Sequence, residues 1–315
     1  MKKYLIFNAV LFCSIICFFS ADLQAQQGFT FEFPFKREIA PAIKLDYGWD
    51  NSSLKGNDKE TLTNSLTSFG VTFGFSAKQD FFPLAKSVKY AFSNKVISDD
   101  EKKSFNDALL DKEFWGLGFS YLMNGDGSSA PVSNLNSLIV INPVDLKGTG
   151  YKFSDNFGLN LLTGNNMAWY YLGLSHYDEA PTPEQLLIYP DMELFNSTIR
   201  FGKKYQSEIS LQCMRGFSIY GGANRMVIFP RTLFWKYLGS EIIYSAGGGV
   251  LNYFTGKIKT SNPYVYPAVD FILKTGLMYG ISELQRSKMN WPINTAPPLI
   301  IDQYRVGVQF DFSLK

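Results

Sequence analysis

What this sequence lacks narrows the functions it can have. It contains three cysteines, two of them near the N-terminus, so the remaining Cys213 has no partner for an internal disulfide. His176 is its only histidine, which leaves too few ligands for a zinc site of the usual kind. The formal net charge is only +2, so the charge balance does not point to nucleic acid as a partner. No apolar run beyond the N-terminal segment is long enough for a membrane-spanning helix.

The N-terminal segment has the pattern of a secretory signal peptide, with Lys2 and Lys3 as its basic start. An almost wholly apolar run follows over residues 4–19, and a short polar stretch then ends in Ala25. The apolar run is shorter than the roughly 20 residues of a spanning helix, and no basic stop-transfer cluster follows it. We therefore expect residues 1–25 to be a signal peptide that is cleaved on export.

Aromatic residues are abundant, at 16% of the chain, while the mean hydropathy is close to zero at −0.06. Without a spanning helix after the signal, this combination suits two architectures. One is a soluble all-β protein. The other is a transmembrane β-barrel, whose strands alternate lipid-facing and lumen-facing residues and therefore have near-neutral mean hydropathy. The pattern of alternation along the strands distinguishes the two.

The C-terminal segment from Tyr304 to Leu314 alternates without interruption between apolar and polar residues. A period of two indicates a β-strand, because successive side chains of a strand point to opposite faces. The run has about the length of a tilted membrane-spanning strand, roughly 9–11 residues. One face carries Tyr304, Val306, Val308, Phe310, Phe312 and Leu314. The other face carries Arg305, Gly307, Gln309, Asp311, Ser313 and Lys315.

This strand resembles the C-terminal signal of bacterial outer-membrane β-barrel proteins. Those proteins commonly end with a polar residue, a glycine, an apolar residue and a final aromatic or apolar residue at fixed spacing. The matching positions here are Arg305, Gly307, Phe310 and Phe312. The chain departs mildly from the pattern, because it continues to Lys315 after the last aromatic residue. The resemblance implies an outer-membrane location, contact with outer-membrane lipid and insertion by the barrel-assembly machinery, and it identifies no subfamily.

Other segments repeat the alternation of the last strand. It is clearest over residues 43–49, 68–76, 115–121 and 208–213. Less regular strands are predicted near residues 137–142, 157–162, 168–175, 197–203, 216–221, 241–254, 264–273 and 275–283. The polar faces are mostly Gly and Ser, whereas a soluble sandwich would carry long charged side chains there. We therefore predict an all-β fold, a transmembrane antiparallel β-barrel of about 12 strands, within a range of roughly 10–14.

One segment interrupts the β pattern. Residues 80–112 contain no period-two run, and Ser98 and Glu101 form a capping box ahead of a helical spacing that includes Leu109. We expect a short helical insertion here, within a single barrel domain that spans residues 26–315. Such an insertion could plug the lumen, pack on the periplasmic side, dock a partner, or serve only as a long connection.

No catalytic, cofactor-binding or metal site is predicted. His176 is the only imidazole base available to a lipid hydrolase or acyltransferase, and the adjacent Ser175 would point to the opposite face of a strand. The glycines at 247–249 are not followed by the Lys and Ser or Thr of a phosphate-binding loop, so we interpret them as a bulge or bend in the barrel wall. Cys213 shares a face with apolar residues and is expected to point to lipid.

Three functions remain open from the sequence. The small polar face with scattered charges favours a non-catalytic channel or transport barrel for small solutes, which is the preferred hypothesis. The helical insertion and the lack of a substrate-specific motif suit an accessory or structural barrel of an outer-membrane secretion or assembly complex, with other envelope proteins as partners. A lipid-modifying enzyme that uses His176 is the third hypothesis.

Residues 24–27 also resemble the signal-peptide ends of Bacteroidota envelope proteins, which implies a Gram-negative cell envelope.

Overall fold

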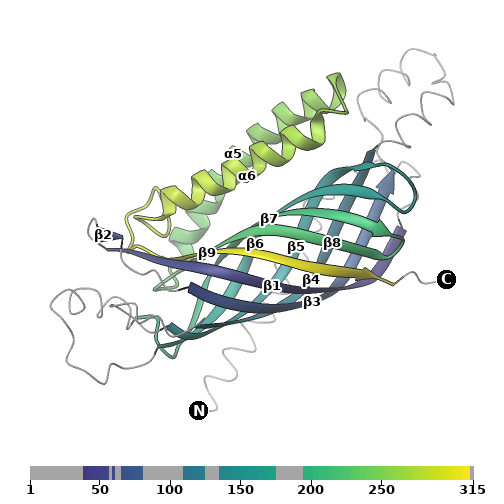
Figure 1. Ribbon diagram of the computed structural model, residues 1–315. Helices are drawn as coiled ribbons and strands as arrows, with labels where there is room; N and C mark the ends of the chain where they lie inside the picture. Colours follow the sequence, from purple (N-terminus) through teal and green to yellow (C-terminus); the bar gives the residue numbers. More distant parts are fainter. Residues whose placement is uncertain are drawn as a thin grey trace, which may run out of the picture. The chain divides into compact units, whose positions relative to one another are not determined.

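The computed structural model describes residues 38–56, 59–60, 65–80, 109–124, 135–174 and 194–312. The predicted signal peptide, His176 and residues 81–108 of the predicted insertion lie outside the described residues. Within the described part, long strands and one helical hairpin make up nearly all of the structure (Figure 1).

Eight long strands pair edge to edge, each antiparallel to its neighbours, and form a closed barrel (Figure 1). Closure comes from the pairing of the last strand with the first. The strands are β1 (Glu38–Gly56), β3 (Ser65–Asp80), β4 (Leu109–Asn124), β5 (Leu135–Lys152), β6 (Gly158–Leu174), β7 (Ile199–Met214), β8 (Phe217–Ile228) and β9 (Leu299–Asp311). A two-residue strand, β2 (Lys59–Glu60), pairs only with the end of β1.

The strands of the barrel are strongly staggered. Following hydrogen-bonded partners once around the barrel from Ile39 leads back to β1 at Trp49, ten residues further along the strand (49 minus 39). With eight strands, this stagger corresponds to a strand tilt of about 40° and to a rise of roughly 2.5 Å per residue along the barrel axis. A barrel of this size is just wide enough for side chains to fill its interior.

The prediction of about 12 strands is wrong, because the barrel has eight. The predicted strands at residues 241–254, 264–273 and 275–283 are mainly helical. In addition, β6 and β7 each correspond to two predicted strands. Their outward faces turn polar midway, as at Asn165 in β6 and Ser207 in β7, so the apolar alternation is interrupted although the strand continues.

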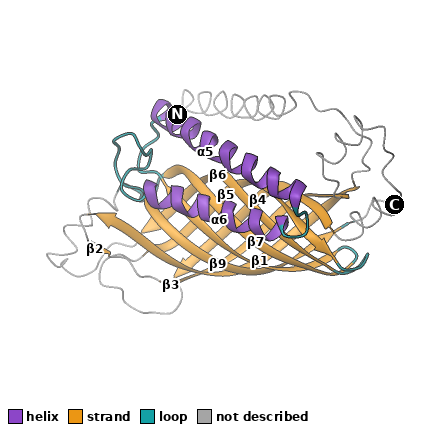
Figure 2. Cartoon of the chain, turned by 90° about the horizontal axis from the view of Figure 1, so that it is seen from above, coloured by secondary structure: helices purple, strands orange, loops and turns teal. Residues whose placement is uncertain are grey.

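A helical hairpin connects β8 to β9. Its first helix, α5 (Phe234–Ser261), packs on the second, α6 (Tyr266–Gln285), and α6 lies on the outer wall of the barrel over β5–β8 (Figures 1 and 2). Apolar side chains such as Ile242, Val250 and Ile272 are exposed on the hairpin. Because apolar residues also face the barrel, neither helix has a narrow apolar stripe, and no clear helical period is visible in the sequence. None of the described helices is long and apolar enough to cross a membrane.

Two smaller expectations are also wrong. The glycines at 247–249 lie within α5 with open space beside them, so they form no bulge in the barrel wall. Leu109 and Lys112, expected at the end of a helical insertion, belong to β4 and pair there with β5. The local helical spacing is overridden by hydrogen bonding within the sheet, because β structure depends on its neighbours more than on its own sequence.

The two ends of the barrel differ. At one end, β5–β6 and β7–β8 are joined by short turns, and Gly216 in the second turn has a φ of +82°, which side chains other than glycine rarely adopt. We call this the turn end; it lies near the C-terminus, to the right in Figure 1. The opposite end, from which the hairpin emerges, is called the hairpin end.

Candidate functional site

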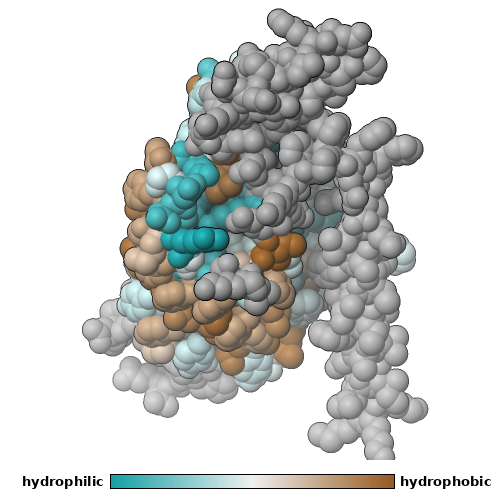
Figure 3. Space-filling model, turned by 90° about the vertical axis from the view of Figure 1, so that its right-hand side faces the viewer, coloured by the Kyte–Doolittle hydropathy of each residue, from teal (hydrophilic) through white to brown (hydrophobic). Residues whose placement is uncertain are grey.

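An apolar belt covers half of the outer wall of the barrel, on β9, β1, β3 and β4. Its members are Leu45, Tyr47, Trp49, Phe69, Phe73, Phe75, Leu117, Phe119, Tyr121, Tyr304, Val306, Phe310 and Phe312, all of them exposed. Phe75 also stacks on Trp115, with ring centres 5.9 Å apart. Viewed from the turn end, hydrophobic residues lie along the left and lower sides, and hydrophilic residues gather above them, nearer the middle (Figure 3). A soluble monomer rarely exposes so large a contiguous apolar surface.

Apolar side chains fill the lumen at the hairpin end. They form one buried cluster: Leu66, Leu122, Leu138, Val140, Ala168, Tyr170, Leu172, Phe195, Met226, Ile228, Leu299 and Ile301. The hydroxyl of Tyr170 lies within this region and donates to the carbonyl oxygen of Lys203 at 2.9 Å. Because such clusters pack at the density of a protein core, these side chains fill the lumen at this end.

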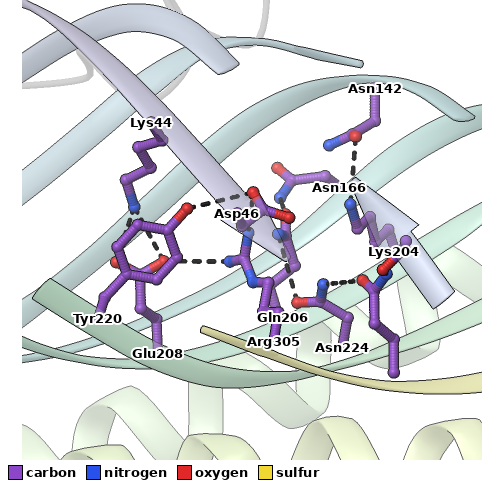
Figure 4. A network of polar contacts seen from close by, with 12 residues as sticks. Lys44, Asp46, Asn142, Asn166, Lys204, Gln206, Glu208, Tyr220, Asn224 and Arg305 are labelled. Carbon is purple, nitrogen blue, oxygen red and sulfur yellow. Dashed lines mark hydrogen bonds and ion pairs between the residues drawn. The ribbon is translucent and has the colours of Figure 1, made fainter. Parts of the chain in front are cut away.

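Closer to the turn end, neutral polar side chains are hydrogen-bonded across the lumen (Figure 4). Asn166 donates to Oε1 of Gln206 at 3.0 Å, and Gln206 donates to Oδ1 of Asn224 at 3.5 Å. The chain of hydrogen bonds continues from Asn224 to Gln303 and from Gln303 to Ser68. These contacts run from β6 through β7, β8 and β9 to β3, and they satisfy amide groups that would be costly to bury alone.

The next layer is a charge-balanced cluster of two cations and two carboxylates (Figure 4). Lys44 Nζ lies 2.7 Å from Oε1 of Glu208, and Nη2 of Arg305 lies 3.1 Å from Oε2 of the same residue. Nη1 of Arg305 lies 3.6 Å from Oδ2 of Asp46, which also accepts a hydrogen bond from the Tyr220 hydroxyl at 3.1 Å. All these groups are buried, and burial of a charge is tolerated only when it is paired in this way.

Polar contacts hold the helical hairpin against the barrel wall. Arg225 projects outward from β8 and pairs with Asp302 of β9, its Nη2 lying 2.7 Å from Oδ2. The same guanidinium pairs with Glu283 of α6 and lies 4.2 Å from the ring centre of Tyr279. Arg225 is therefore shared between barrel and hairpin, and it is only 8% exposed.

A second contact of the hairpin centres on Lys203, which projects outward from β7 and is 1% exposed. Its ammonium lies among three aromatic rings, 5.0 Å from the centre of Tyr244 and 5.6 and 5.7 Å from those of Tyr205 and Tyr237. Glu241 of α5 supplies the counter-charge. Because cation–π attraction is strongest where water is excluded, the hairpin stabilises a lysine that would otherwise face lipid.

Near the turn end, the tip of the hairpin and the barrel wall border a polar cavity of about 200 Å³. Lys259 of α5 reaches Asp111 of β4 at 3.5 Å, and the Tyr151 hydroxyl donates to the Tyr264 carbonyl at 2.9 Å. Further charged side chains that line the cavity are Glu113, Lys147, Asp270 and Lys274. The hairpin is thus attached to the barrel at its tip as well as near its base.

Beside α6, the outer wall is polar where the apolar belt would be expected to continue. We call this strip the polar lane: Glu113, Asp145, Lys147, Thr163 and Asn165. Asp145 and Lys147 pair at 3.0 Å, and their side chains are 52% and 51% exposed. Asp145 lies directly opposite Trp115 in the β4–β5 pairing, and Trp115 stacks on Phe75 of the belt. The polar lane and the apolar belt therefore lie at the same height along the barrel axis.

Exposed apolar residues outside and paired charges inside are the reverse of a soluble protein. A closed sheet satisfies its own backbone groups and turns apolar side chains to lipid, as spanning a bilayer requires. The chain is an outer-membrane β-barrel. The resemblance to bacterial outer-membrane barrels and the outer-membrane location, both predicted from the sequence, are confirmed.

Two solved structures are similar to this barrel at a low level. One is Ail, the attachment invasion locus protein of Yersinia pestis, with a TM-score of 0.29 and 10% identity over 87% of this chain and 99% of Ail. The other is Ail in complex with the heparin analogue sucrose octasulfate, with a TM-score of 0.30 and 6% identity over the same shares. Likeness at this level carries no inference about binding or activity. No protein-family model matches the sequence, and no curated protein matches it either.

The residues of the predicted insertion signal lie on both faces of β9. Phe310 and Phe312 are exposed in the apolar belt, whereas Arg305 points into the lumen and joins the charged cluster. A Cβ atom added to Gly307 would lie 2.6 Å from Cζ of Tyr220, so only glycine leaves room for the tyrosine ring. The role of these residues in membrane insertion remains a prediction.

Other candidate residues have simpler surroundings. Cys213 carries a free thiol and is partly buried. No three His, Cys, Asp or Glu side chains of the described part lie close enough to hold a metal ion.

Sequence reasoning missed Lys203 and Arg225 as anchors of the hairpin. A signal was present, because Lys203 is in phase with the outward Ile209 and Arg225 with the outward Ile219, where lipid alone would not favour a charge.

Proposed function

We propose that this barrel is a non-catalytic accessory subunit that binds another envelope protein through its polar lane, within a larger outer-membrane complex. The half-exposed Asp145–Lys147 pair at the depth of the belt carries the proposal. A lysine on the lipid face of a barrel costs about 2–4 kcal/mol at the bilayer midplane. A protein surface laid over the polar lane would remove that cost and supply hydrogen-bonding partners.

The helical hairpin shows that charged residues on the outer wall of this barrel can be covered by protein. Over β7 and β8, the outward charges Lys203 and Arg225 are covered by the chain's own helices. The polar lane continues the same polar wall across β6 and β5 toward β4, and its Asn165, Asp145 and Lys147 stay exposed. A partner that continues the protein cover beyond α6 would bury these groups as the hairpin buries Lys203. The exposed apolar face of the hairpin would then border lipid or the same partner.

The channel hypothesis, which the sequence favoured, has less support. The described lumen is filled by the apolar cluster at the hairpin end and by polar layers below it. The small inward residues that suggested a pore make room for large neighbours, as Gly307 does for Tyr220. The enzyme hypothesis rests on His176 outside the described residues; an unchanged lipid profile for His176→Ala would remove it.

The proposal is tested by photo-cross-linking in cells, followed by purification in mild detergent. A photo-reactive amino acid at Lys147 is expected to give an adduct with one envelope protein. The control places the same group at Val306, in the apolar belt on the opposite wall, where no protein adduct is expected. The double variant Asp145→Leu with Lys147→Leu is expected to insert normally and to lose the partner.

Two results would overturn the proposal. The first is recovery of the wild-type chain only as a free monomer, with no protein adduct at Lys147. The second is equal adduct formation at Lys147 and Val306, because it would show random collision in the membrane.

A further inference from the structure

Apart from Arg305, whose Nε is unpaired although its other nitrogens bind Glu208 and Asp46, six buried polar side chains inside the barrel have atoms without a hydrogen-bonding partner among the described residues. They are Ser76 (Oγ), Lys112 (Nζ), Asn160 (Nδ2), Ser210 (Oγ), Ser218 (Oγ) and Gln309 (Oε1). Each of the six side chains is at most 2% exposed. Buried polar atoms are rarely left unpaired in proteins, so a group of them on facing strands calls for a ligand or ordered solvent.

These side chains lie in one layer of the lumen, which we call the lower layer. Asn160 pairs directly with Ser210 across β6 and β7, and Ser218 pairs directly with Gln309 across β8 and β9. On β3 and β4, Ser76 pairs with Phe114, two residues from Lys112. Because the strands are tilted, two residues that pair across neighbouring strands differ in height along the barrel axis by about one residue. With this offset included, the six side chains lie within a layer roughly 6 Å thick.

The charged cluster lies next to the lower layer on the side of the hairpin end. Gln309 pairs with Lys44 in the β1–β9 ladder, and Ser218 is two residues from Tyr220. The carboxylates of the cluster are already taken, because Glu208 binds Lys44 and Arg305. Asp46 and Asp311 accept hydrogen bonds from Tyr220 and Gln309. None of these carboxylates is available to Lys112.

Lys112 brings an unpaired positive charge into the lower layer. Its ammonium is the one cation of the six unpaired groups, and among the described residues no carboxylate lies within 4.0 Å of it. Three serine hydroxyls and the amide of Asn160 can donate hydrogen bonds alongside it. Water could satisfy the hydroxyls but could not neutralise the ammonium, and a buried charge without a counter-charge is strongly disfavoured.

We infer that the lower layer binds a small inorganic anion of the size of chloride, with Lys112 as its counter-charge. The hydroxyls of Ser76, Ser210 and Ser218 and the amide of Asn160 surround the same layer from four other strands. Serines on facing strands of an eight-stranded barrel cannot all touch one small ion, so water held by these groups completes the shell of the anion. This role is independent of any partner on the outer wall, because all six side chains are inside the barrel.

The inference is tested by thermal unfolding of the full chain in detergent, in chloride and in the bulky anion gluconate at equal ionic strength. A ligand that binds only the folded state raises the folding equilibrium constant about elevenfold at ten times its dissociation constant. The wild-type chain is expected to unfold at a higher temperature in chloride. Lys112→Met is expected to lose this difference, whereas the matched control Lys236→Met, at an exposed lysine of α5, keeps it.

A second variant covers the case in which Lys112→Met fails to fold. Ser210→Ala with Ser218→Ala keeps the ammonium and removes two donors, so the chloride effect is expected to shrink without vanishing. A crystal grown with bromide is expected to show an anomalous peak beside Lys112 Nζ. Equal unfolding temperatures in chloride and gluconate, or ordered water alone beside Lys112, would overturn the inference. Cross-linking at Lys147 is unaffected by either result, so this inference and the proposed function fail separately.

Discussion

Lys44 and Glu208 are 164 positions apart in the sequence, yet Lys44 Nζ donates to both carboxylate oxygens of Glu208, at 2.7 and 2.9 Å. Arg305 shares the same carboxylate. The contact ties β1, β7 and β9 together through the middle of the lumen, where the side chains are almost wholly buried. Glu208 is therefore the residue on which two buried cations depend.

Glu208→Leu is expected to lower the free energy of unfolding by about 3–5 kcal/mol, because it leaves Lys44 and Arg305 short of a counter-charge in a buried site. Urea unfolding in detergent, followed by tryptophan fluorescence, measures the loss. The matched control combines Glu208→Leu with Lys44→Met, which removes both partners and is expected to cost less than Glu208→Leu alone. A loss below about 1 kcal/mol for Glu208→Leu would contradict the role given to this cluster.

Arg225→Leu is expected to loosen the hairpin without unfolding the barrel. The change removes the ion pairs to Asp302 and Glu283 and the contact with the Tyr279 ring. Asp302 then loses its arginine partner, whereas Glu283 keeps its pair with Arg286. Limited proteolysis should cut within α5 or α6 several times faster than in the wild type. Lys236→Met, which alters an exposed contact to the Asn294 carbonyl, serves as the control and should leave the cutting rate unchanged.

Gly307→Ala is expected to destabilise the barrel by about 1–3 kcal/mol, because the added carbon meets Tyr220 and the carbonyl oxygen of Leu45. The fraction of folded barrel, read from its resistance to unfolding in cold detergent gels, should fall accordingly. Gly221→Ala is the matched control, since its nearest neighbour is the Arg305 carbonyl at 3.9 Å. If both variants fold equally well, the steric role of Gly307 is wrong.

Planar bilayers containing the purified chain are expected to show no stable conductance. Deletion of residues 81–108 is expected to leave this result unchanged, because the apolar cluster in the lumen is built from Leu138, Tyr170, Ile301 and their neighbours. Steady single-channel steps from the wild-type chain would restore the channel hypothesis. Steps seen only after the deletion would instead show that the deleted segment closes a pore.

The alternation of Tyr304, Val306, Phe310 and Phe312 with Arg305 and Gln309 was enough to predict the class of the protein. A strand has only two faces, so a strict period of two assigns one to lipid and the other to the lumen before any neighbour is known. The same argument located long stretches of β1, β3 and β4 correctly. Local sequence therefore determined which side chains face outward and that the chain belongs in an outer membrane.

The number of strands was decided only by tertiary structure. Helices α5 and α6 lie between the barrel and its surroundings, so both of their sides are apolar and the sequence shows no helical period. The interruption at Ser207 is likewise explained only by α6, whose Thr275 hydroxyl lies 3.0 Å from the Ser207 hydroxyl. The meeting of Lys44 with Glu208, the enclosure of Lys203 and the layer around Lys112 depend on closure of the barrel. Closure sets the stagger of all eight strands at once, and no single segment of sequence carries that information.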